Sequence, residues 1–309
     1  MADALDRHAA ETIQAGSKSF ATAAKLFDPA TRRSVMMLYA WCRHCDDVID
    51  EQHLGMPSHG EGSTDSSEQR MAELRRMTRQ AYAGEPMQSP PFAAFQQVAL
   101  QHRLPECYPL AHLEGFAMDV QERRYDTIDD TLSYCYHVAG VVGIMMAWIM
   151  GVEDDATLDR ACDLGLAFQL TNIARDIVDD AKVGRCYLPR TWLNEAGIPP
   201  NEIADPRHRG ALANLAARLI DLAEPYYQSA RGGFGALPPR SAWAIATAHG
   251  VYREIGIEVE ARGAKAWDQR VSTSKADKLR LLVKGLGQTV ASRWQTPASR
   301  PESLWQRPD

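Results

Sequence analysis

The stretch "YAWCRHCDDVIDEQ", residues 39–52, joins an apolar helical pattern to a cluster of acidic residues. Within it, Tyr39, Arg43, Asp46 and Asp50 are separated by four, three and four residues, which places them on one stripe of an α-helix. Carboxylates four residues apart on a helix repel each other. The stripe is therefore either a solvated surface or a site where a ligand offsets the repulsion.

A second stretch, "FQLTNIARDIVDDAKVGRCYLP", repeats this arrangement far along the chain. Gln169, Asn172, Asp176 and Asp180 are spaced by three, four and four residues. Two such helices facing each other would repel, but divalent cations between them would turn the carboxylates into a cage. Mg²⁺ prefers carboxylate and water oxygens and usually completes its shell with substrate phosphates. One such motif alone is usually a solvated acidic face, but two favour a site for metal ions and a diphosphate.

Arginines accompany both acidic stripes. Arg43 and Arg175 each precede an aspartate, and Arg185 follows the second stretch. The planar guanidinium group donates pairs of hydrogen bonds that suit phosphate oxygens. These three side chains are candidates for diphosphate binding.

Apolar residues recur with a helical period almost throughout the chain, and alternating strand patterns are nearly absent, so we expect an all-α protein. Asp28 followed by Pro29 predicts a helix start, and "SSEQ" from Ser66 to Gln69 resembles a capping box. The predicted helices cover residues 29–51, 67–84, 91–103, 108–124, 130–150, 155–181, 207–231, 239–262 and 275–290. A Gly/Ser-rich loop, "HLGMPSHGEGSTDSSE", separates the first two.

We expect one domain over residues 1–309, with a core over about 10–290 and a frayed, Pro-rich polar tail at 297–309. Hydrophobic residues make up 45% and charged residues 24% of the 309 residues, as in an ordinary globular protein. The net charge of −6 gives no basic footprint for nucleic acid. The 15-residue apolar run from Val138 to Val152 is shorter than a membrane span and predicts a buried helix.

The cysteine pattern and the N-terminus favour the cytoplasm. The six cysteines lack the spacing of a disulfide framework. Cys42 and Cys45 form a C-x-x-C without a second cysteine pair, which disfavours zinc or redox chemistry. The N-terminal residues have no apolar core typical of a secretory signal.

Two further segments allow more than one interpretation. In "YCYHVAGVVG", Ala139, Gly140 and Gly143 would permit close helix packing or leave room for a long hydrocarbon. In "GSKSF", Ser17 and Ser19 are typical of a turn or cap, which the residues alone favour over ligand binding.

The segments "GSKSF", "YAWCRHCDDVIDE", "YCYHVAGVVG" and "QLTNIARDIVDDAKVGRCYLP" together resemble the squalene/phytoene synthase family over nearly the whole chain. The resemblance implies an all-α isoprenoid-synthase fold around a central hydrophobic cavity. It also implies two Asp-rich helices that hold Mg²⁺ or Mn²⁺ and a head-to-head joining of two prenyl diphosphates.

Residue roles follow from the same resemblance. The implied metal ligands are Asp46, Asp50, Asn172, Asp176 and Asp180. The implied diphosphate-binding and polar substrate-binding residues are Ser17, Ser19, Tyr39, Arg43, Gln169, Asn172, Arg175, Arg185, Tyr252 and Arg270. Tyr134 and Tyr187 would border the reacting carbons, and the residues implied for the prenyl tails are Phe20, Val138, Ala139 and Gly143. Where relatives often have Gly-Glu-Asp, this chain has Val178-Asp179-Asp180, which keeps the carboxylates.

The implied reaction condenses two molecules of geranylgeranyl diphosphate through prephytoene diphosphate to phytoene, without NADPH, as a step of carotenoid biosynthesis. One alternative is a dehydrosqualene or squalene-type synthase that uses farnesyl diphosphate. A non-enzyme alternative is a scaffold pseudoenzyme of the same fold. We also expect peripheral association with the inner face of the membrane, contact with downstream carotenoid enzymes and no nucleic-acid partner.

Overall fold

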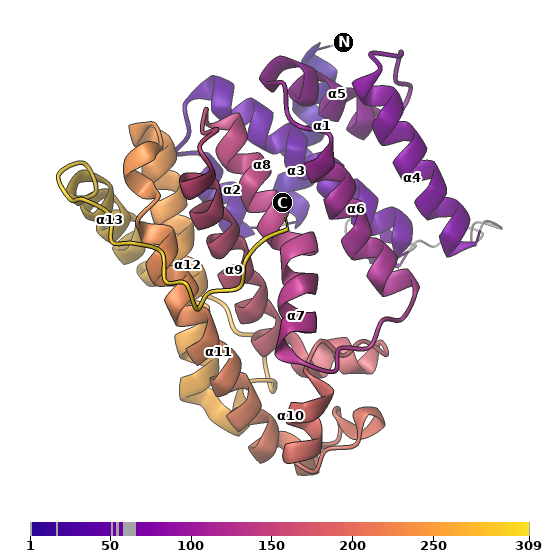
Figure 1. Cartoon of the computed structure of the whole chain (residues 1–309), viewed down its shortest axis with the longest axis vertical. Helices are drawn as coiled ribbons and strands as arrows, with labels where there is room; N and C mark the ends of the chain where they lie inside the picture. The colour runs from indigo at the N-terminus through magenta and orange to yellow at the C-terminus, as the bar shows by residue number, and fades with distance from the viewer. Residues whose placement is uncertain (1, 17, 51, 54–55, 58–65, 309) are drawn as a thin grey trace.

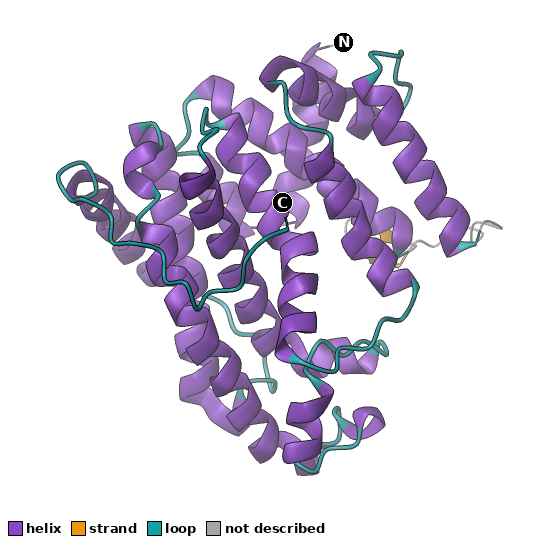
Figure 2. Ribbon diagram, in the orientation of Figure 1, coloured by secondary structure: helices purple, strands orange, loops and turns teal. Residues whose placement is uncertain are grey.

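Helices make up nearly all of the secondary structure of the protein in this computed structural model (Figure 2). The structure describes residues 2–16, 18–50, 52–53, 56–57 and 66–308, without the side chains of residues 2–4, 14–16, 18–20, 52–53 and 56–57. The predicted all-α class is confirmed. The α-helices are α1 Ala2–Gly16, α2 Lys18–Ala24, α3 Pro29–Ile49, α4 Ser67–Tyr82, α5 Pro90–His102, α6 Cys107–Val120, α7 Ile128–Cys135, α8 Val141–Ile149, α9 Asp155–Lys182, α10 Arg190–Glu195, α11 Arg209–Arg231, α12 Pro239–Arg262 and α13 Lys275–Ala291.

Every helix expected from the sequence is present, with boundaries shifted by a few residues. The Asp28 carboxylate caps α3 by accepting hydrogen bonds from the backbone N–H groups of Ala30 and Thr31, both at 3.0 Å. Ser66 and Gln69 form the predicted capping box of α4. The local cap chemistry read from the sequence thus fixes where these helices begin.

Four details of the prediction were wrong. Helix α3 ends at Ile49 instead of residue 51, with Asp50 as its C-cap. Helices α1, α2 and α10 were not predicted, and α2 contains the backbone of Ser19, which was read as a turn or cap. The predicted loop after α3 contains two short strands, β1 Gln52–His53 and β2 Met56–Pro57, paired antiparallel. The expectation of a single domain stays a prediction.

Helix α9 is the central element of the bundle (Figure 1). It packs against α11 and α12 on one side and against α8 and the short π-helical segment Tyr136–Gly140 on the other. Glycines allow the closest of these contacts: a Cβ on Gly143 would lie 2.3 Å from the carbonyl oxygen of Ala161, and one on Gly165 would lie 2.3 Å from that of Ala139. The small residues of "YCYHVAGVVG" therefore do permit close helix packing.

The helical stretch from Ile128 to Ile149 is the apolar centre of the protein. It is long and apolar enough to cross a membrane, with a mean hydropathy of 1.5, yet 61% of its most apolar window is buried inside the protein. It runs through α7, the π-helical segment and α8. The predicted buried helix over residues 130–150 is confirmed, and it starts two residues earlier, at Ile128.

The C-terminal tail is packed, so the prediction of a frayed tail was wrong. Figure 1 shows the segment after α13 running back across the front of the bundle towards α7. Leu304 is buried, and the backbone N–H of Trp305 donates to the Tyr226 hydroxyl at 3.1 Å. Arg300 and Arg307 pair with aspartates of α9. Specific ion pairs, invisible in the composition of the tail, hold it in place.

Candidate active site

An apolar cavity of about 520 Å³ lies between the π-helical segment, α8, α9, α11 and α12. Three residues expected to contact a prenyl tail, Val138, Ala139 and Gly143, line it. The small side chains of "YCYHVAGVVG" thus both pack against α9 and leave space. The cavity wall also contains apolar residues that were not predicted, among them Met146, Leu164, Phe168, Phe234, Leu237 and Ile245.

Polar side chains from three helices and one loop converge on the same cavity. The predicted residues that line it are Tyr39, Arg43, Gln169, Asn172, Arg175, Tyr252 and Arg270. Tyr252 stacks on Phe168 with ring centroids 4.1 Å apart and an interplanar angle of 19°. The cavity is thus amphipathic, with a long apolar wall and a cluster of guanidinium and amide groups.

In the first acidic motif, Arg43 joins two neighbouring carboxylates. Its guanidinium lies 2.9 Å from Asp46 and 2.6 Å from Asp47. Burial raises the pKa of Asp46 to about 6, because a charged carboxylate loses hydration there and Arg43 offsets the loss only in part. A bound cation would favour the ionised form of this carboxylate.

In the second acidic motif, the aspartates differ in whether an arginine or lysine pairs with them. Asp176 accepts a hydrogen bond from Arg175 at 2.8 Å and another from Arg270 at 3.2 Å. Asp180 makes no ion pair with any residue that the structure describes, and burial, followed by the nearby charge of Asp176, raises its pKa to about 7. Asp179 pairs with Lys182 at 2.9 Å on the exposed side of the helix.

Arg185 connects the two motifs. It follows α9 in the chain, and its guanidinium donates to the carboxylate of Asp50 at the end of α3, with one contact at 3.1 Å. The ends of α3 and α9 are therefore adjacent, as the paired-motif interpretation requires. Arg185 itself does not line the cavity.

Tyr134 and Tyr187 form a separate aromatic cluster beside this connection. Their rings stack with centroids 4.5 Å apart, and each hydroxyl donates to the Asp119 carboxylate at 3.2 Å. Burial raises the pKa of Asp119 to about 6, against the opposing charge of Arg185. Neither tyrosine is part of the cavity lining, so their predicted place at the reacting carbons stays a prediction.

Asp119 is the polar residue that sequence reasoning missed. It lies near the end of α6, in the segment "LEGFAMDV", and it is not part of an aspartate pair at i, i+4 like those of α3 and α9. Only the fold brings it to Tyr134 and Tyr187. The available signal was a carboxylate between two apolar residues, Met118 and Val120.

Three predicted side chains cannot be placed. Ser17 lies outside the described residues, and so do the side chains of Ser19 and Phe20. Their predicted contacts with a diphosphate and a prenyl tail stay predictions.

The donor set fits a divalent cation that a substrate helps to bind. The Asn172 side-chain oxygen is buried beside the cavity and has no hydrogen-bond partner among the described residues. Asp180 adds a carboxylate without an ion pair. Within the same part of the chain, no group of three or more His, Cys, Asp or Glu side chains lies close enough to form a complete protein cage. When substrate phosphates complete its coordination shell, Mg²⁺ is bound by only a few protein oxygens, as here.

The fold and site define an isoprenoid-synthase helical protein. A crystal structure of a dehydrosqualene synthase in complex with ligand superimposes with a TM-score of 0.82, covering 94% of this chain and 98% of that one at 24% identity, which shows the fold alone. A family model described as squalene/phytoene synthase matches residues 13–277. The chain belongs to the squalene/phytoene synthase family.

Closely similar relatives extend over almost the whole chain. A 15-cis-phytoene synthase of Pantoea ananas is 61% identical over 304 residues, which cover 98% of each protein. A 15-cis-phytoene synthase of Enterobacter agglomerans is 62% identical over 296 residues, covering 96% of this chain and all of the relative. These comparisons confirm the predicted prenyltransferase type of enzyme and the phytoene synthase function in carotenoid biosynthesis.

Proposed function

We propose that the protein condenses two molecules of geranylgeranyl diphosphate to phytoene through prephytoene diphosphate, releasing two diphosphates and two protons from carbon, one in each half of the reaction. The observation that carries this proposal is the amphipathic cavity, whose apolar wall leads to Arg43, Arg175 and Arg270. A long hydrocarbon ending in a diphosphate matches that distribution of polarity.

In this proposal the basic side chains bind the diphosphates. Arg43 and Arg175 now contact carboxylates of their own helices and would exchange them for phosphate oxygens when substrate enters. Arg270, Tyr252, Gln169 and Asn172 would complete the polar end of the pocket, together with Ser17 and Ser19. Arg185 would order the ends of α3 and α9 through Asp50.

Metal ions would be held by Asp46, Asp50, Asn172, Asp176 and Asp180. When bound, Mg²⁺ or Mn²⁺ supplies positive charge that stabilises the departing diphosphate. The carboxylates of Asp46 and Asp180, whose pKa values burial raises to about 6 and 7, would lose their protons on binding.

The remaining residues would shape the carbon skeleton and exclude water. The allylic carbon of the first substrate loses its diphosphate, the double bond of the second attacks it, and loss of a proton closes the ring of a cyclopropylcarbinyl diphosphate. This intermediate loses its diphosphate, rearranges and releases a proton to give the central double bond. Tyr134 and Tyr187, both held by Asp119, would border the reacting carbons, where aromatic faces stabilise positive charge.

The proposal also places the reaction in the cytoplasm, at the inner face of the membrane. There the apolar product would pass to downstream carotenoid enzymes.

Incubation of purified protein with Mg²⁺ or Mn²⁺ and either prenyl diphosphate, with and without NADPH, tests the function. A forty-carbon product with three central conjugated double bonds, made from geranylgeranyl diphosphate without NADPH, is the expected result. A thirty-carbon product made in preference from farnesyl diphosphate would contradict the substrate assignment. If no hydrocarbon forms under any of these conditions, the assignment as an enzyme is contradicted and the scaffold alternative is favoured.

A further inference from the structure

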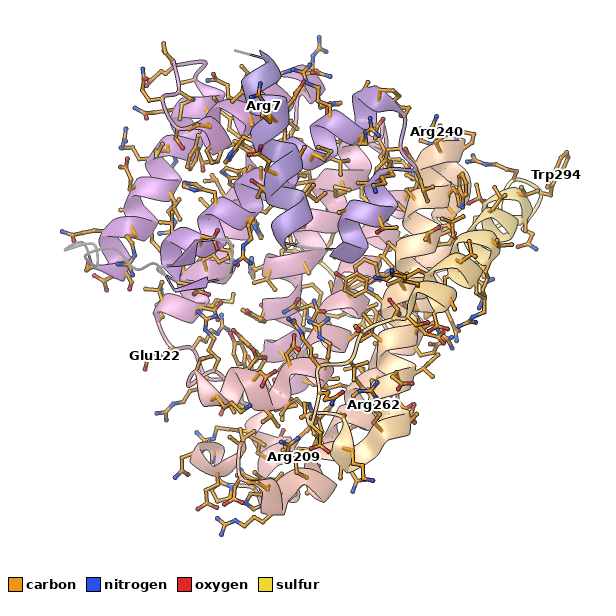
Figure 3. The ribbon with its side chains drawn as sticks, turned by 180° about the vertical axis from the view of Figure 1, so that it is seen from behind. Arg7, Glu122, Arg209, Arg240, Arg262 and Trp294 are labelled. Carbon is orange, nitrogen blue, oxygen red and sulfur yellow. The ribbon has the colours of Figure 1, made fainter. Side chains whose placement is uncertain are left out.

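Helix α13 carries an unusual apolar face. Leu279, Val283, Leu286, Val290 and Trp294 are separated by four, three, four and four residues, so they form one stripe along the helix and its C-terminal turn. Their exposed fractions run from 44% to 87%, and they are five of the eight large apolar side chains that are exposed in the described part of the chain. Figure 3 shows Trp294 projecting from the edge of the molecule.

The opposite face of α13 is already used in the core. Leu281, Gly285 and Thr289 are buried, and a Cβ on Gly285 would lie 2.8 Å from the Thr247 hydroxyl of α12. The Trp243 indole of α12 donates to the carbonyl oxygen of Leu282 at 2.9 Å. These contacts fix the rotation of α13, so the apolar stripe faces outward as part of the folded structure.

The charge around the stripe indicates the kind of partner. Residues 275–294 contain five basic residues and one acidic residue, a net charge of +4, whereas the whole chain has −6. Lys275 and Lys284 are exposed and make no ion pair with any described residue. A second copy of the chain would oppose this positive face with the same charge. A surface that is negative outside and apolar beneath complements it better.

We propose that the outward face of α13, with Trp294, docks the protein on a bilayer that contains anionic lipids. The helix would lie in the interface, with the five apolar side chains inserted and the lysines near lipid phosphates. Helix α12, on which α13 packs, lines the cavity with Ile245, Ala248 and Tyr252. One helix therefore separates the docking face from the cavity. An apolar product would have only a short distance to cross from the cavity to the bilayer, and this advantage rests on the proposed function.

Co-sedimentation of the full chain with vesicles tests the docking face without any measurement of activity. We expect binding to phosphatidylcholine vesicles that contain about one third phosphatidylglycerol, and weaker binding to pure phosphatidylcholine. The substitution Val283→Asp should weaken the partition into anionic vesicles by about tenfold, because it places a charge in the inserted stripe. The double substitution Lys275→Gln/Lys284→Gln should weaken it by about fivefold for each lysine removed and reduce its sensitivity to salt.

Leu100→Asp is the matched control, since Leu100 is 49% exposed on α5, on the opposite side of the view in Figure 1. It should leave vesicle binding unchanged, and all variants should keep the helical circular dichroism of the parent. Equal loss with Leu100→Asp, or no loss with Val283→Asp, would overturn the proposal. So would a Val283→Asp variant that changes from dimer to monomer in light scattering while still binding vesicles, because the stripe would then be a contact between copies.

Discussion

Helix α9 carries aspartates four residues apart in both of its halves, and the two halves serve different ends. In the first half, arginines of the C-terminal tail form ion pairs with Asp155, Asp159 and Asp163. Arg307 contacts Asp155 and Asp159, each at 2.6 Å, and Arg300 binds the buried Asp163 through two hydrogen bonds of 2.8 and 2.9 Å. This half of the acidic pattern is a structural anchor.

In the second half, Asp176 is paired and Asp180 has no ion pair among the described residues. Arg185, whose positive charge acts on Asp180, binds Asp50 at the end of α3. The unpaired carboxylate is unfavourable for the protein alone, as the raised pKa of Asp180 indicates. Aspartate spacing thus predicts which side chains share a helix face, whereas ion pairing with arginines decides whether the carboxylates remain available to a ligand.

The largest expected effect concerns activity. Replacing Asp180 by Asn should lower kcat by at least about 10²-fold, because it removes a carboxylate proposed to hold a metal ion at the leaving group. Turnover of geranylgeranyl diphosphate at saturating Mg²⁺ measures the effect. The matched substitution Asp159→Asn in the first half of α9 should leave kcat within about twofold. Similar losses in both variants would show that the two halves of α9 do not differ in function.

The second prediction concerns stability. Arg300→Met leaves the buried Asp163 without its ion-pair partner, with only the Ser229 hydroxyl still donating to it, and should lower the free energy of unfolding by about 3 kcal/mol, since a buried charge without a counter-charge keeps most of its desolvation cost. Urea unfolding followed by circular dichroism measures this change. Arg307→Gln is the control: its two partners, Asp155 and Asp159, are 88% and 30% exposed, so neither is left as a fully buried charge and the loss should be about 1 kcal/mol. A larger loss for Arg307→Gln than for Arg300→Met would contradict the role of the tail as an anchor on Asp163.

The sequence predicts most of this fold because local signals decide most of its helices. Caps of this kind accept hydrogen bonds from backbone N–H groups within one helical turn, as Asp28 does for α3 and Ser66 with Gln69 for α4. The helix start can therefore be predicted without knowledge of the fold. The tail has no such local signal. Arg300 reaches an aspartate 137 residues away in the chain, and only the folded bundle brings the two together.

The same distinction applies to the candidate site. Spacing on one helix identified Arg43, Asp46, Asp176 and Asp180, because residues three or four apart must share a face. The contact of Arg185 with Asp50 spans 135 residues, and Asp119 meets Tyr187 across 68. Such contacts depend on how α3, α6 and α9 pack, which helical periodicity does not specify.

The smallest expected effect is a pH dependence of the metal-free protein. In the folded chain the pKa of Asp180 is about 7, whereas in an unfolded chain an aspartate has a pKa of about 3.9. Between these values the folded state binds the proton more tightly, so stability falls as pH rises from about 4 to 7 and is level above that range. Asp46, with a pKa of about 6, contributes in the same direction.

Asp180→Asn cannot ionise, so in excess EDTA this variant should melt about 2–4 °C above the parent at pH 8, and the difference should shrink towards pH 5. Asp159→Asn, from the anchored half of α9, should show no such gain, because it removes a contact to Arg307. With Mg²⁺ and inorganic diphosphate added, the parent should regain stability and the advantage of Asp180→Asn should disappear, since the carboxylate then has its cation. A variant that melts below the parent at pH 8 in EDTA would mean that Asp180 is already neutralised by the protein, and the contrast between the two halves of α9 would fail.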